Sequence, residues 1–224
     1  MRIKICGITN RDDATTAIEA GADALGFNFY PKSPRSISLA TLQQIGGNLA
    51  VNKVGVFVNH ADPLQVAIDG GLDTIQLHGD ETPQELVEIV NGAQSQGKQV
   101  WRAFRCKENS LADVAEYLER CESLGALPAA VLLDAYAPDA FGGTGKVVDW
   151  NSVREQRRLL RELPLILAGG LTPENIAEAI RTAQPDGVDV ASGVESSPGK
   201  KDAAKVRDFV AAAKLAFTEI TGQS

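Results

Sequence analysis

The sequence predicts an α/β protein that forms a single-domain (β/α)₈ barrel, the TIM barrel, and three observations lead to this prediction. Short segments rich in β-branched and apolar residues recur along the chain, with longer helical segments between them. Eight such units in 224 residues leave about 28 residues for each, which suits a strand, a helix and two short loops. No linker or shift in composition divides residues 1–224, so one domain is expected.

The predicted strands lie at residues 2–6, 24–28, 53–57, 73–77, 99–104, 130–134, 165–168 and 187–190. Strands that alternate with helices in this way are expected to run parallel and to be joined by right-handed crossovers. Eight units of similar length favour a closed barrel over an open sheet.

Helix starts are marked by capping residues that follow a strand and its loop. Thr82 and Glu85 form a capping box, with Pro83 at the first helical position. The same signal is expected at Asp62-Pro63, at Thr172-Pro173 and at Ser110 with Asp113.

Strand parity predicts which side chains point into the barrel. In the first strand Ile3 and Ile5 should face the helices, so Lys4 and Cys6 share the inward face. The same count turns further polar side chains inward on later strands: Asn28, Gln76, His78, Asp134 and Asp189. Barrel interiors are normally filled by branched apolar residues, so polar residues at the carboxyl ends of strands mark the active face.

Cys6 and Asp134 are the predicted catalytic pair, since each ends a strand. Carboxyl ends of barrel strands can present an acid and a base to one substrate from opposite sides. A thiol with an ordinary pKa of about 8.5 needs modest activation to act as a base near neutrality. A small buried hydrophobe is the alternative for Cys6 and a helix-capping carboxylate is the alternative for Asp134. Their pairing at strand ends favours acid–base chemistry.

Three glycine-bearing loops indicate phosphate binding, because glycine lets backbone N–H groups approach an anion closely. They are residues 141–146, residues 168–171 with Gly169 and Gly170, and residues 191–195 with Ser192 and Gly193. Loops after the seventh and eighth strands are where barrels of this kind most often bind a phosphate. Ordinary turns explain most single glycine pairs, but glycine-bearing loops at both expected places are stronger support.

Two further side chains and one pair of side chains have two possible roles each. Arg35 lies in a loop restrained by two prolines and can clamp a substrate carboxylate, or it is a solvated surface arginine. His78 ends the fourth strand and either orients substrate or is structural. Lys4 and Asp189 either neutralise each other inside the barrel or take part in catalysis, and we favour the structural role.

Composition excludes several classes of partner. A net charge of −7 without a long Lys/Arg cluster argues against nucleic-acid or membrane-surface binding, so a small ligand is expected. No apolar run approaches the ~20 residues of a membrane span, and no signal peptide is recognisable, so a cytoplasmic protein is expected. Cys6, Cys106 and Cys121 show neither CxxC spacing nor nearby histidines, and neither a disulfide framework nor a metal site is predicted.

The motifs taken in order resemble phosphoribosylanthranilate isomerase of tryptophan biosynthesis. They are Lys-Ile-Cys-Gly-Ile-Thr at 4–9, Ser-Pro-Arg-Ser-Ile at 33–37, Gln-Leu-His-Gly at 76–79, Leu-Leu-Asp at 132–134, Gly-Gly-Thr-Gly at 142–145 with Asp149-Trp150, Leu-Ala-Gly-Gly-Leu at 167–171 and Asp-Val-Ala-Ser-Gly-Val-Glu at 189–195. Each motif alone is modest support, whereas the ordered set covers nearly the whole chain and is highly specific.

The resemblance implies a cofactor-free Amadori rearrangement of N-(5-phosphoribosyl)anthranilate. The protein itself is expected to be a monomer or a homodimer. In the family's mechanism an aspartate protonates the ribose ring oxygen, and a cysteine thiolate then removes the C2 proton. By position, Asp134 would be the acid and Cys6 the base, and Arg35 would hold the anthranilate carboxylate. The implied phosphate contacts are the backbones of Gly169, Gly170, Ser192 and Gly193.

Two alternatives stay open at this point. The related histidine-pathway isomerase performs the same rearrangement on a substrate with two phosphates, but it typically uses two aspartates at strand ends, and here the first strand ends in Cys6. A catalytically inactive barrel that only binds a phosphorylated metabolite or a partner enzyme is the third hypothesis. The presence of both proton-transfer groups argues against it, while a broadened specificity for both pathway substrates is compatible with the sequence.

Overall fold

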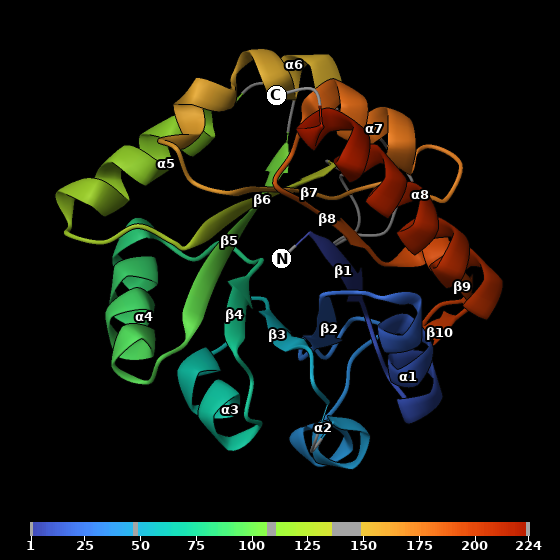
Figure 1. Ribbon diagram of the computed structural model, residues 1–224. Helices are drawn as coiled ribbons and strands as arrows, with labels where there is room; N and C mark the ends of the chain where they lie inside the picture. Colours follow the sequence, from blue (N-terminus) through green and yellow to red (C-terminus); the bar gives the residue numbers. More distant parts are fainter. Residues whose placement is uncertain (1, 47–48, 107–110, 136–148, 223–224) are drawn as a thin grey trace.

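A computed structural model describes residues 2–46, 49–106, 111–135 and 149–222 of the chain. Eight parallel strands follow one another in sequence order around a closed barrel, and the last strand pairs with the first (Figure 1). The helices lie outside this ring of strands (Figure 1). The predicted (β/α)₈ barrel is therefore confirmed.

The barrel strands agree with the predicted segments to within two residues at either end. They are β1 (Ile3–Cys6), β2 (Ala24–Asn28), β3 (Asn52–Phe57), β4 (Thr74–Leu77), β5 (Gln99–Cys106), β6 (Ala130–Ala135), β7 (Leu165–Leu167) and β8 (Gly187–Val190). A short antiparallel pair, β9 (Glu195–Ser197) and β10 (Lys200–Lys201), follows β8 and was not predicted.

The helices of the described residues follow the strands in turn. They are α1 (Arg11–Ala20), α2 (Leu39–Gly46), α3 (Pro63–Asp69), α4 (Pro83–Ser95), α5 (Ala112–Ser123), α6 (Trp150–Glu155), α7 (Ile176–Ala183) and α8 (Ala203–Thr221), with short 3₁₀ turns η1 (Arg157–Leu160) and η2 (Ser192–Val194). Within the described ranges no helix is long and apolar enough to cross a membrane.

The predicted helix caps are confirmed at two positions and corrected at a third. Thr82 forms the full capping box at the start of α4, and Asp62 accepts the hydrogen bond that caps α3. The helix expected to begin at Thr172-Pro173 begins regularly only at Ile176. The side chain of Asn175 explains the delay, because it accepts from the Thr172 N–H and donates to the Gly170 carbonyl, which fixes a turn first. Ser110, the other expected cap, lies outside the described residues.

The buried apolar residues form two layers that confirm the parity prediction. Ile3 and Ile5 belong to the layer between strands and helices, together with helix residues such as Ala14 and Phe209. The second, smaller cluster fills the barrel itself and consists of Ala24, Val54, Trp101, Ala103, Ala130, Leu132, Ile166 and Ala168. This apolar layer leaves the polar inward residues at the carboxyl ends of the strands to line a pocket.

Candidate active site

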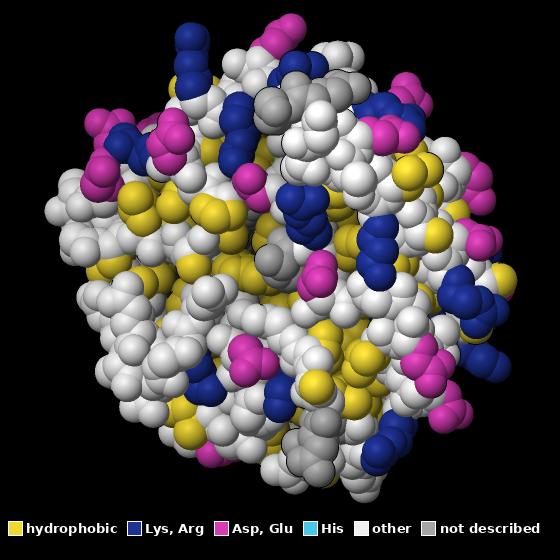
Figure 2. All heavy atoms as spheres, viewed as in Figure 1, with side chains coloured by type: hydrophobic (Ala, Val, Ile, Leu, Met, Phe, Trp, Pro, Cys, Tyr) yellow, Lys and Arg dark blue, Asp and Glu magenta, His cyan; other side chains and the backbone are white. Residues whose placement is uncertain are grey.

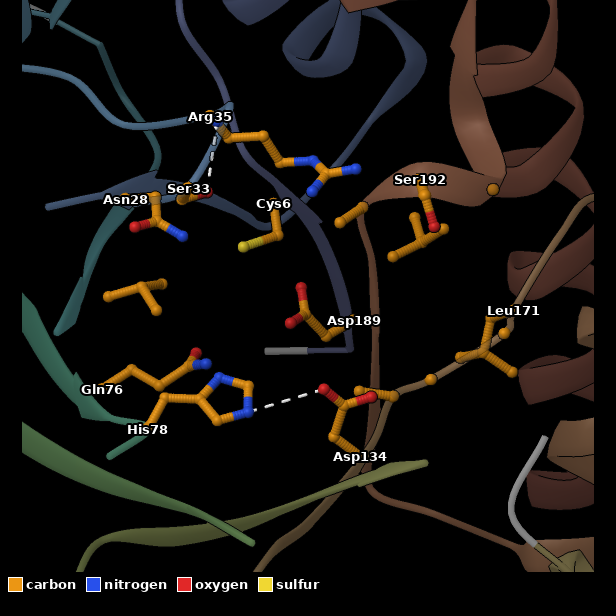
Figure 3. Close-up of a pocket in the computed structure, with 17 residues that line it drawn as sticks. Cys6, Asn28, Ser33, Arg35, Gln76, His78, Asp134, Leu171, Asp189 and Ser192 are labelled. Carbon is orange, nitrogen blue, oxygen red and sulfur yellow. Dashed lines mark hydrogen bonds and ion pairs between the residues drawn. The ribbon is translucent and has the colours of Figure 1, made fainter. Parts of the chain in front are cut away.

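A pocket opens where the barrel strands end. The inward residues expected from strand parity, except the completely buried Lys4, line it together with the segment after β2 and the glycine loops after β7 and β8 (Figure 3). Its polar side chains belong to Cys6, Asn28, Ser33, Arg35, Gln76, His78, Asp134, Asp189 and Ser192. All the predicted site residues therefore line one pocket, although they are up to 187 residues apart in sequence between Cys6 and Gly193.

Cys6 ends β1 at the floor of this pocket and is 8% exposed. Gly7 then turns the chain with a φ of +78°, where a methyl group would lie 2.5 Å from Arg35 Cδ. Two residues before the thiol, Lys4 is completely buried and its Nζ donates to Asp189 Oδ1 at 2.9 Å. The expected neutralisation of Lys4 by Asp189 is thus confirmed as an ion pair inside the barrel.

Burial raises the pKa of the Cys6 thiol above its ordinary value, and the Asp189 carboxylate adds to this effect. The ammonium groups of Lys4 and Lys201 act in the opposite direction, without cancelling the rise. The site therefore favours the neutral thiol near pH 7 and makes the thiolate, once formed, a stronger base than an exposed one.

Asp134 reaches the pocket from β6, which is not a neighbour of β1 in the barrel. Its Oδ2 lies 3.5 Å from His78 Nε2, and Figure 3 shows the imidazole turned toward the carboxyl group. The Nε2 atom is buried and makes no hydrogen bond within the described residues. The Asp134–His78 contact leaves both side chains facing the same space as Cys6 (Figure 3).

Arg35 is held by a partner that was not predicted from the sequence. Its Nε and Nη2 donate to the two carboxylate oxygens of Glu195 at 2.8 and 2.7 Å, and Lys201 Nζ donates to the same carboxylate at 3.0 Å. Glu195 is 8% exposed and Lys201 5%. The Arg35 fork is therefore not a freely solvated surface group but is fixed at the pocket wall by a buried anion. Glu195 ends the motif at 189–195, which is the one sequence signal that marks it.

The two glycine loops after β7 and β8 meet each other. Gly169 and Gly170 adopt φ values of 82° and 64°, which a residue with a side chain rarely adopts. Gly193 packs directly on the backbone of Leu171, so that a side chain at 193 would collide with it. Within the described part of the chain, no hydrogen bond uses the backbone N–H of Gly170, Ser192 or Gly193. Such N–H groups at a pocket wall suit an anionic ligand. The third glycine loop, 141–146, lies outside the described residues.

One more buried polar atom of the pocket has no hydrogen-bond partner among the described residues. Gln76 is 1% exposed, and its Oε1 makes no hydrogen bond within the described chain.

The described residues include no cluster of three or more His, Cys, Asp or Glu side chains that could hold a metal ion.

A closed parallel barrel with an acidic group, a thiol and two glycine loops around a pocket at the carboxyl ends of its strands indicates the class of protein, which is a (β/α)₈-barrel enzyme. Comparisons with known proteins narrow this class. Residues 3–212 match the family described as N-(5'phosphoribosyl)anthranilate (PRA) isomerase. The chain belongs to this family.

Curated relatives carry the same name. N-(5'-phosphoribosyl)anthranilate isomerase of Trichlorobacter lovleyi is 46% identical over 223 residues, which cover 97% of this chain and 100% of that protein. The protein of the same name from Geotalea uraniireducens is 48% identical over 218 residues, 95% of this chain and 98% of the relative.

Solved structures of isomerases with this name are similar to the structure of this chain. The crystal structure of phosphoribosyl anthranilate isomerase from Thermotoga maritima has a TM-score of 0.82 at 38% identity, and the match covers 96% of this chain and 99% of that one. A structure of the isomerase in complex with reduced 1-(o-carboxyphenylamino)-1-deoxyribulose 5-phosphate has a TM-score of 0.79 at 37% identity, with the same coverage of both chains.

Proposed function

We propose that this protein converts N-(5-phosphoribosyl)anthranilate, an aminoaldose, into the corresponding 1-deoxyribulose 5-phosphate aminoketose, with Cys6 and Asp134 as its base and acid. Family membership over residues 3–212 supports the reaction, and the observation that carries the roles is that Cys6 and Asp134 line one pocket from separate strands. A related structure contains a reduced form of the product of this rearrangement.

The rearrangement needs one proton delivered and one removed. Asp134 in its protonated form gives its proton to the ribose ring oxygen, the bond from this oxygen to C1 breaks, and a protonated Schiff base forms at C1. The Cys6 thiolate then takes the C2 proton, and the electron pair of the C2–H bond moves to form an enolamine, which tautomerises to the ketone. The charged nitrogen makes the C2 proton acidic, so a thiolate is a sufficiently strong base.

The substrate carries two anionic groups, a carboxylate and a phosphate, and each would be bound by a different part of the pocket. Arg35, held by Glu195, would face the anthranilate carboxylate, for which a planar guanidinium is well suited. The backbone N–H groups of Gly169, Gly170, Ser192 and Gly193 would bind the phosphate. His78 would orient substrate near Asp134, from which it is 3.5 Å away.

The remaining expectations concern the setting of the enzyme. We propose one catalytic domain over residues 1–224, a monomer or a homodimer, and a small phosphorylated substrate as the principal partner rather than a nucleic acid or a membrane. The acidic net charge of −7 supports the last point. A step of amino-acid biosynthesis would place the protein in the cytoplasm.

Fluorescence tests the proposal directly. Purified protein is mixed with freshly made N-(5-phosphoribosyl)anthranilate, and the loss of the substrate's fluorescence is followed with the Cys6→Ala variant alongside. Rapid turnover that collapses in the variant is expected. A folded wild-type protein that leaves the fluorescence unchanged would contradict the assigned substrate.

A further inference from the structure

Lys4 and Asp189 form an ion pair that is buried inside the barrel, a place where apolar side chains would serve the stability of the fold as well. Lys4 is 0% exposed and Asp189 8%, and the two residues are in register on the adjacent strands β1 and β8. Removing two charges from water is costly, and well-packed apolar side chains of similar volume are often at least as stable as a buried pair. A role beyond stability would explain charges at this position.

Both charges lie beside the Cys6 sulfur. A methyl group built on Gly26 of the neighbouring strand β2 would lie 2.6 Å from Cys6 Sγ and 3.0 Å from Lys4 Nζ. The sulfur and the ammonium are therefore within about 6 Å of each other, close enough for each to influence the ionisation of the other. Figure 3 shows the Asp189 carboxylate beside Cys6 on the same wall of the pocket.

The other charged or titratable groups around the thiol are engaged with one another. They are Arg35, His78, Asp134, Glu195 and Lys201. Arg35 and Lys201 both bond to Glu195, and His78 contacts Asp134. Lys201 also acts on the sulfur, but less than Asp189 and Lys4, so the Lys4–Asp189 pair has the largest influence of the charged groups.

We propose that Lys4 and Asp189 are positioning residues that set the charge of the Cys6 sulfur in opposite directions, Lys4 favouring the thiolate and Asp189 the neutral thiol. This inference rests on the proposed role of Cys6 as the base. The pair balances two requirements: enough thiolate must exist to react, and the thiolate must remain basic enough to remove a carbon-bound proton. Gly26 leaves the space that lets the sulfur and the ammonium approach each other.

The directions in which the pKa values of Cys6 and Lys4 are shifted agree with this arrangement. After burial, Asp189 is the strongest influence that raises the pKa of Cys6, and Lys4 is the first that lowers it. Burial alone would lower the pKa of Lys4, but Asp189 and Cys6 together outweigh burial and raise it. Lys4 is therefore charged at neutral pH.

A titration of the thiol in two variants tests the proposal. Thiolate formation is followed by ultraviolet absorbance as the pH rises, and the signal of the same protein with Cys6→Ala is subtracted so that only Cys6 remains. Lys4→Met should move the midpoint upward and Asp189→Asn should move it downward, each by at least about one pH unit. Shifts in the same direction, or unchanged midpoints, would overturn the proposal.

Two controls separate this effect from damage to the fold. In the Lys4→Met/Asp189→Asn double variant the opposite shifts should largely cancel, whereas a merely structural role predicts no such cancellation. Arg102→Met removes a cation that is also buried and paired, with Glu81 at 3.0 Å, so its thiol midpoint should not move. The titration needs no substrate, so its outcome is independent of whether the isomerase activity is found.

Discussion

At the scale of single residues, the ionisation of Cys6 should determine how the reactivity of its sulfur depends on pH. Burial raises the pKa of this thiol, and only the thiolate reacts rapidly with an alkylating reagent. The rate at which iodoacetamide modifies Cys6 should therefore increase with pH from neutrality to beyond about 8.5, where an ordinary thiol ionises. Mass spectrometry of the peptide that contains Cys6 measures this rate, and a rate that has already reached its plateau at neutral pH would count against the prediction.

Removal of either proton-transfer group should abolish most of the activity. Cys6→Ala and Asp134→Asn should each reduce kcat by at least about 10²-fold, since general acid–base groups typically contribute that much. Circular dichroism should show the wild-type fold, because both side chains lie at the pocket rather than in the apolar layers. Near-normal turnover by a folded variant would remove that residue from its assigned role.

Glu195 should control substrate binding through Arg35. Burial alone would raise the pKa of this carboxyl, but the bonds from Arg35 and Lys201 outweigh burial and lower it, so Glu195 is charged at neutral pH. Glu195→Gln weakens the bidentate pair, and we expect KM to rise about tenfold with kcat little changed, a loss in the range of one hydrogen bond to a charged group. Arg35→Ala should show the same pattern more strongly. An unchanged KM in both variants would contradict the proposal that Arg35 binds the carboxylate of the substrate.

The residue scale also shows where sequence reasoning succeeded. Parity along a single strand was enough to separate Ile5 from Cys6, because successive side chains of a strand point to opposite faces. It was not enough to find Glu195, 160 residues away from Arg35 in the chain. A partner of that kind is set by how the loops fold over the barrel, and no local pattern encodes it.

At the scale of elements, the capping box of α4 offers a stability test. Thr82 accepts a hydrogen bond from the Glu85 N–H, and Glu85 accepts one from the Thr82 N–H at 2.7 Å. Thr82→Ala should lower the free energy of unfolding by about 1 kcal/mol, as measured by chemical denaturation. Thr218→Ala in the last turn of α8 is a matched control, since the side chain of this exposed threonine donates to the Lys214 carbonyl and caps no helix start, and it should have much less effect. Equal losses would show that the cap is not the cause.

Strands were easier to predict than loops. The eight barrel strands are buried apolar segments, and their composition alone locates them. The pair β9 and β10 is short and polar, so no periodicity indicates it, yet it places Glu195 and Lys201 beside Arg35. The start of α7 was predicted too early because a proline after a threonine resembles a cap, whereas the side chain of Asn175 fixes a turn there first.

At the scale of the whole molecule, the two ends of the barrel differ: one end carries the pocket, and the other carries side chains that join neighbouring strands. Polar side chains at the carboxyl ends of the strands line the pocket. At the opposite ends of the strands, three aspartates lie directly before β2, β4 and β8. Each accepts a hydrogen bond from a backbone N–H group at the start of the neighbouring strand, which is β1, β3 or β7. Asp23 accepts from Ile3, Asp73 from Lys53 and Asp186 from Leu165, at 2.7 to 2.9 Å. These aspartates join neighbouring strands at the end of the barrel opposite the pocket, so they should affect stability only.

Asp73 is the clearest residue for testing this division, because its bond to the Lys53 N–H is 2.8 Å long and unites the starts of β3 and β4. Asp73→Ala should lower the free energy of unfolding by about 1 kcal/mol, the usual contribution of one such hydrogen bond. Its kcat and KM at a temperature where the variant is fully folded should equal those of the wild type. Asp134→Asn should show the reverse, with activity lost and most stability kept. A folded Asp73→Ala protein with impaired turnover would mean that the two ends of the barrel are coupled, and the separation of stability from chemistry along the barrel axis would then fail.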